Sequence, residues 1–76
     1  MEKLNDVPKW VVDVSAANTL REVAKRSEVT DPEKAKELHR QASELYRDAS
    51  EGVSGYQKSR MLELSNEEAN FANQKR

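Results

Sequence analysis

Residues 30–52, TDPEKAKELHRQASELYRDASEG, are the stretch of the chain that decides its fold. A seven-residue unit that begins with alanine occurs at Ala35, occurs again at Ala42 and starts a third time at Ala49. At 3.6 residues per turn, this repeat places small and apolar side chains on one side of a helix and charged side chains on the other. The apolar side consists of Ala35, Leu38, Ala42, Leu45, Tyr46 and Ala49. The stretch therefore predicts an amphipathic helix.

Both ends of this helix carry sequence signals. Thr30 and Glu33 have the spacing of a capping box, and Pro32 falls in the first turn, where its missing N–H is tolerated. Gly52 stands where a helix often ends in a left-handed residue. These signals predict a helix over residues 31–51.

The preceding segment has apolar side chains on two sides. One face carries Val12, Ala16, Leu20 and Val23, and the other carries Val7, Val11 and Val14. Two interpretations fit: a helix over residues 7–27, or an extended arm over residues 9–14 followed by a helix that begins near Ser15. We favour the helix because Pro8 suits a helix start. Glu28 and Val29 would then form the connection to the next helix.

A third helix is predicted over residues 55–72, because Ser54 and Gln57 have capping-box spacing after a Gly-Val-Ser-Gly break. Ser65 and Glu68 interrupt its apolar stripe. The stripe otherwise consists of Met61, Leu62, Leu64, Ala69, Phe71 and Ala72. Residues 1–6 and 73–76 are polar, and we expect them to fray.

The composition limits the size of the core. Only 36% of the 76 residues are hydrophobic, and isoleucine is absent. We therefore predict one all-α domain over residues 1–76, a small three-helix bundle whose last two helices form a helical hairpin. Dimerisation would supply the apolar area that so small a core lacks.

Charge and residue types argue against several function classes. Thirteen basic and fourteen acidic side chains are interspersed along the chain, so we expect no general affinity for nucleic acid or anionic membranes. No stretch approaches the roughly 18 apolar residues of a membrane span, and we expect a cytoplasmic protein. Without cysteine, and with His39 as the lone histidine, we expect no enzyme activity, cofactor, metal site or small-molecule ligand. We expect His39 to be structural or solvent-facing and the pair Glu67-Glu68 to lie on the surface.

Residues 19–30, TLREVAKRSEVT, resemble the opening of a helix-turn-helix unit of bacterial repressors. Thr19 stands where that family places its helix cap. The family's apolar positions correspond to Leu20, Val23, Ala24 and Val29. The resemblance implies a DNA-binding protein, which we keep as the alternative function. The helix that follows is rich in acidic residues, and these oppose contacts with phosphate.

The most specific pattern is therefore the alanine and leucine seam. Such a seam suits an antiparallel helix pair, either within one chain or between two chains. We expect a small non-enzymatic protein that regulates or binds other proteins through apolar helix faces, as a homodimer or with another protein. The expected interaction residues are Trp10, Leu38, Ala42, Leu45, Tyr46 and Ala49.

Overall fold

The computed structural model describes residues 7–73, and these form three α-helices. Helix α1 spans Lys9–Thr30, α2 spans Pro32–Ser50 and α3 spans Gly55–Asn73. Each helix packs against the next one in sequence. The predicted fold class, a small all-α bundle of three helices with a hairpin formed by the last two, is confirmed.

The first two helices meet at a single residue, Asp31. The residues expected to connect them, 28–29, instead belong to α1, which continues to Thr30. The Asp31 carboxylate accepts a hydrogen bond from the Lys34 backbone N–H at 3.3 Å and caps α2, so the predicted Thr30 cap is wrong. Pro32 starts α2 as expected, and it disfavours helical geometry at the residue before it. The chain therefore breaks at Asp31.

The N-terminal alternative is resolved in favour of the helix, since residues 9–14 are helical. Trp10 lies against Gly52, where an added Cβ would come within 2.8 Å of the Trp10 Cβ. Within residues 7–73, Gly55 is the residue with a positive φ, at 61°. The left-handed role predicted for Gly52 is therefore wrong, and this glycine instead permits the close approach of the indole.

The fraying predicted for the two ends of the chain can be compared with the structure at residue 73 alone. Helix α3 includes residue 73, which we expected to fray. The fraying predicted for residues 1–6 and 74–76 lies outside the described residues.

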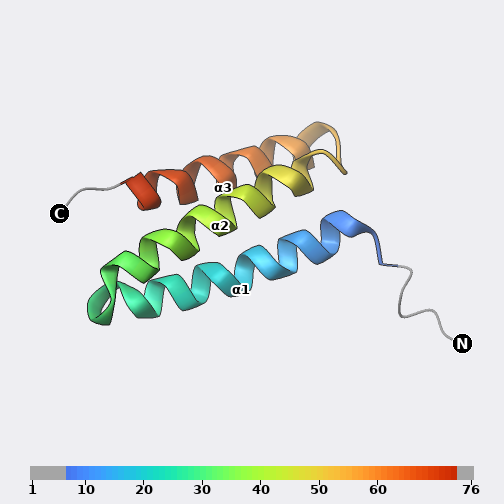
Figure 1. Ribbon diagram of the computed structural model, residues 1–76. Coiled ribbons are helices and arrows are strands. Elements are labelled where there is room, and N and C mark those ends of the chain that lie inside the picture. Colours follow the sequence, from blue (N-terminus) through green and yellow to red (C-terminus); the bar gives the residue numbers. More distant parts are fainter. Residues whose placement is uncertain (1–6, 74–76) are drawn as a thin grey trace, which may run out of the picture.

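Helix α2 lies between the other two helices, and the chain reverses direction at each connection (Figure 1). The seam between α1 and α2 is built from alanines, which let the two helix backbones approach closely. The fully buried apolar side chains are Ala17, Ala24, Ala35, Ala42, Ala49 and Tyr46. By contrast, every Val, Leu, Met, Phe and Trp side chain within residues 7–73 keeps part of its surface exposed.

Polar side chains fill much of the remaining interior. The buried polar residues are Asp13, His39, Ser43, Ser50, Ser65 and Glu68. The α2–α3 contact includes the Ser65 hydroxyl, which donates to the Ser43 carbonyl oxygen at 2.9 Å. The stripe interruptions of the third helix, Ser65 and Glu68, are thus its two fully buried residues. Among its expected core residues, Leu62 is exposed.

Candidate functional site

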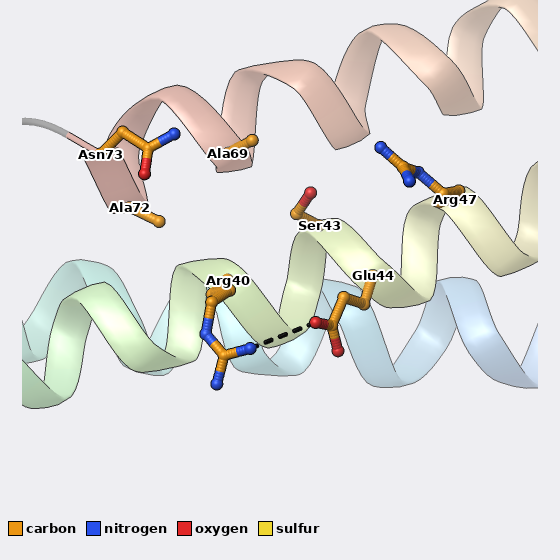
Figure 2. A pocket seen from close by; sticks show the side chains of 7 residues that line it. All are labelled: Arg40, Ser43, Glu44, Arg47, Ala69, Ala72 and Asn73. Carbon is orange, nitrogen blue, oxygen red and sulfur yellow. Dashed lines mark hydrogen bonds and ion pairs between the residues drawn. The ribbon is translucent and has the colours of Figure 1, made fainter.

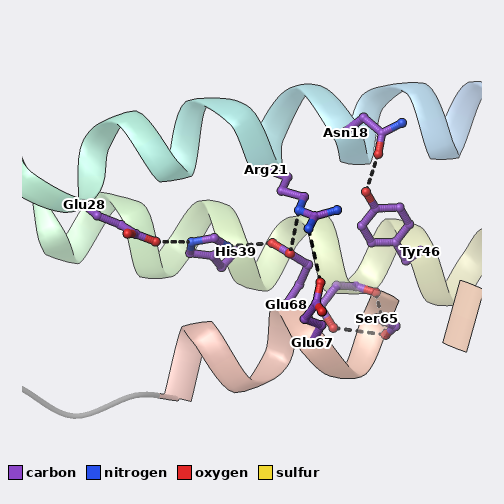
Figure 3. Close-up of polar contacts among 9 residues, drawn as sticks. Asn18, Arg21, Glu28, His39, Tyr46, Ser65, Glu67 and Glu68 are labelled. Carbon is purple, nitrogen blue, oxygen red and sulfur yellow. Dashed lines mark hydrogen bonds and ion pairs between the residues drawn. The ribbon is translucent and has the colours of Figure 1, made fainter. Parts of the chain in front are cut away.

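Five ionisable side chains from all three helices form one connected set of contacts around the buried residues His39 and Glu68, and we call them the charge cluster (Figure 3). Helix α1 contributes Arg21 and Glu28, α2 contributes His39, and α3 contributes Glu67 and Glu68.

His39 is the centre of this cluster and is only 2% exposed. Its Nδ1 lies 2.6 Å from Glu68 Oε1, and its Nε2 lies 2.9 Å from Glu28 Oε2. Each imidazole nitrogen therefore has its own carboxyl partner, one on α3 and one on α1. The Phe71 ring stacks on the imidazole with its centroid 4.9 Å away.

Glu68 is completely buried and links His39 to α1. Its second oxygen, Oε2, lies 3.3 Å from Arg21 Nε, although the angle between them does not make a hydrogen bond. The same guanidinium reaches Glu67 at 3.2 Å. Arg21 therefore joins α1 to α3 through its side chain. The prediction of a surface position is wrong for Glu68, while Glu67 is half-exposed.

The cluster joins the three helices through contacts between its own side chains. Both imidazole nitrogens are already paired with carboxylates. The nearby Tyr46 hydroxyl donates to Asn18 Oδ1, and burial raises the pKa of this phenol above its usual 10.0. Within residues 7–73, no group of three or more acidic or histidine side chains is arranged to hold a metal ion.

The six predicted interaction residues fall into two groups. Ala42, Tyr46 and Ala49 are fully buried and pack within the chain. Trp10, Leu38 and Leu45 are half-buried and keep apolar surface on the outside. Only the second group can therefore touch a partner while the bundle stays folded.

Leu38 and Leu45 belong to one side of the α1–α2 hairpin that carries several partly exposed apolar side chains, and we call it the hairpin face. At about 100° per residue, they project beside the Ala42 seam, on the side of α2 away from Ser43 and α3. The α1 residues of this face project on the side of Ala17 away from Arg21. The apolar residues of the hairpin face are Val12, Leu20, Val23, Leu38 and Leu45, and all five retain exposed surface. Its polar residues on α2 are Lys34, Gln41 and Asp48.

A shallow cavity of about 300 Å³ lies between α2 and α3 on another side of the bundle (Figure 2). Arg40 borders it, but its guanidinium is paired with Glu37 and Glu44. The remaining lining side chains include Ser43, which is turned to Ser65. Three of its polar residues are thus already paired within the chain, and Arg47 and Asn73 are the other polar residues that line it.

The segment that resembles a helix-turn-helix opening has a different geometry here. Residues 19–30 lie in one continuous helix, and Thr19 is internal to it, with its hydroxyl donating to the Ser15 carbonyl oxygen. A helix-turn-helix unit needs a turn of three or four residues between helices that cross at a steep angle. The single-residue connection at Asp31 and the antiparallel packing do not provide one.

The chain matches no protein-family model, and neither curated proteins nor solved structures gave a match. None of the helices within residues 7–73 combines the length and the apolar character that crossing a membrane requires. The class defined by the fold and by these surfaces is thus a small all-α bundle with an internal charge cluster and an open apolar hairpin face.

Proposed function

We propose that the chain is a small non-enzymatic helical protein that acts by binding proteins, another copy of itself or a different protein, through apolar helix faces. The supporting observation is the incomplete burial of its large apolar side chains. Aliphatic and aromatic side chains are those most often fully buried in folded domains. Within residues 7–73 none of the Val, Leu, Met, Phe or Trp side chains reaches full burial.

The exposed apolar side chains of the hairpin face lie where a binding partner could cover them. Leu20 and Leu45 pack against the small core of Ala17, Ala42 and Tyr46 on one side and meet solvent on the other. Removing apolar area from water contributes about 25 cal/mol per Å², so covering such a face favours association. Half-buried side chains are also held in place by the fold, and their ordering on binding costs little further entropy.

The test compares the wild type with a variant in which Leu38 and Leu45 are both replaced by glutamine. Glu37→Gln/Glu44→Gln is the control, because it changes the solvated side of the same helix. Sedimentation equilibrium measures self-association, and affinity capture from a host lysate measures other partners. We expect the leucine variant to lose the complexes that the wild type and the control both form. A wild type that stays monomeric and captures nothing beyond what the leucine variant captures would refute the proposal.

A further inference from the structure

We infer that the hairpin face is occupied by a second copy of this chain, with the two α2 helices antiparallel and the two-fold axis beside Gln41. This inference rests on the proposed function and adds to it the identity of the partner and the register of the contact. It is carried by the order of side chains along α2, by their charges and by the area of the face.

The residues of α2 that project from the hairpin face are spaced alternately by four and three positions. They are Lys34, Leu38, Gln41, Leu45 and Asp48. This spacing is that of a seam between two packed helices. Counted outward from Gln41, a leucine stands on each side, followed by lysine at one end and aspartate at the other. An antiparallel copy therefore places Leu38 against Leu45 of the partner copy and Lys34 against Asp48 of the partner copy.

The terminal charges of this seam are available for such pairing. Lys34 and Asp48 are exposed, and neither forms an ion pair with another residue in the described range 7–73. Arg40, on the neighbouring side of α2, is instead paired within its own helix with Glu37 and Glu44. A two-fold axis would repeat the Lys34–Asp48 pair, so both ends of the seam are satisfied at once.

Helix α1 adds Leu20 and Val23 to the middle of the same face, while Lys9 lies beside Asp48 at one end of it. Trp10 contacts Gly52 at one end of the hairpin, so position 21 of α1 lies level with position 41 of α2. Leu20 and Val23 thus flank the level of the two-fold axis. The same rotation that pairs the α2 helices brings these two side chains against Val23 and Leu20 of the partner copy.

The area of the hairpin face is sufficient for a specific dimer. Helix α2 has 19 residues and is therefore about 28 Å long, and two adjacent helices are about 20 Å wide. Their product, the footprint of the whole hairpin side, is at most about 560 Å² per copy, or roughly 1,100 Å² for both, which reaches the roughly 1,000 Å² expected of a biological interface. The α2 seam is complementary to an antiparallel copy of itself, both in charge and in the spacing of its leucines. A homodimer requires this self-complementarity, whereas binding to an unrelated protein does not.

Charge reversal tests the register. Lys34→Glu and Asp48→Lys each replace two attractive contacts by two repulsive ones, so each should raise the dimer Kd at least about tenfold. The double variant Lys34→Glu/Asp48→Lys restores opposite charges and should return the Kd to within about threefold of the wild type. Both single changes improve the match to the α2 helix dipole, so helicity should not fall. Lys25→Glu and Glu51→Lys are the matched controls and should leave the Kd unchanged.

A symmetric disulfide provides a second readout, because the chain contains no cysteine. Gln41→Cys would place two thiols at the two-fold axis, where they should oxidise to a covalent dimer, whereas Arg47→Cys on another side of α2 should not. A dimer indifferent to the charge reversals, or joined as readily through Arg47→Cys, would overturn the inferred face while leaving the proposed function standing. A wild type that is monomeric up to about 0.5 mM would exclude the second copy as occupant. If that monomer still captures another protein in a leucine-dependent manner, the proposed function alone survives.

Discussion

Replacing Glu68 by leucine should strongly destabilise the bundle. The carboxylate is completely buried, and it lies 2.6 Å from His39 Nδ1 and 3.3 Å from Arg21 Nε. Its removal leaves the imidazole in the interior without its shorter partner, and the loss of one partner from a buried pair costs about 3–5 kcal/mol. Because Arg21 is partly exposed and water can replace its contact, we expect the lower end, about 3 kcal/mol.

This loss is large for a chain of 76 residues, whose total stability is expected to be about 4–11 kcal/mol. Urea denaturation followed by circular dichroism at the helical band measures it, and the thermal midpoint should fall by about 12–24 °C. Glu67→Leu is the control, since this neighbouring half-exposed side chain makes one contact with Arg21 and should cost under about 1 kcal/mol. An equal or higher urea midpoint for Glu68→Leu would refute the energetic role of the cluster.

Replacing Arg21 and His39 of the charge cluster as well should restore the stability that Glu68→Leu loses. Converting the buried centre of the cluster to apolar residues, as in Arg21→Met/His39→Leu/Glu68→Leu, removes the desolvated charges together. Such replacements are often neutral or stabilising by about 1–4 kcal/mol when the volumes are similar. We therefore expect the triple variant to unfold at a urea concentration at or above that of the wild type. A triple variant less stable than Glu68→Leu would show that the cost arises from packing and not from charge.

Three further predictions concern single positions. Gly52→Ala should cost about 1–3 kcal/mol in thermal unfolding because its Cβ would press on the Trp10 Cβ, and the penalty should shrink in a Trp10→Gly background, which removes that atom. Leu45→Glu should give a folded, helical monomer by light scattering coupled to size exclusion, since Leu45 is only half-buried; loss of helicity would show that it belongs to the monomer core. Burial raises the pKa of Tyr46, so its protonated phenol stabilises the fold below about pH 10, and this contribution is lost as the pH rises through the raised pKa. The urea midpoint should consequently fall more steeply above about pH 10 for the wild type than for Tyr46→Phe, and parallel slopes would contradict the assignment.

The helices could be predicted from the sequence because their signals are local. The repeat around Ala42 and proline near the start of α2 fixed its existence and nearly its bounds. The sequence alone predicts the connection at the two residues before Thr30, because Thr30 with Glu33 and Asp31 with Lys34 offer competing caps one residue apart. Proline decides between them by acting on the residue before it, and that effect favours Asp31.

The charge cluster could not be predicted as a unit, since its members are far apart in sequence. Glu68 falls in the apolar stripe of α3, which was a signal of burial, but its partner His39 stands 29 positions earlier on another helix. Pairing the two requires knowing how α3 is aligned against α2. Helical periodicity indicates on which side of its helix a residue lies. It does not indicate which residue of a neighbouring helix lies at the same position along the helix axis.

The single-residue connection at Asp31 has a consequence for alternative assemblies. If Asp31 became helical, α1 and α2 would merge into one rod of about 63 Å, and two such rods could exchange halves in a domain-swapped dimer. Pro32 opposes this outcome, because its ring disfavours helical geometry at Asp31 and it cannot donate a hydrogen bond to the preceding turn. Pro32 therefore favours the α1–α2 hairpin within one chain over a domain-swapped exchange of helices between two chains.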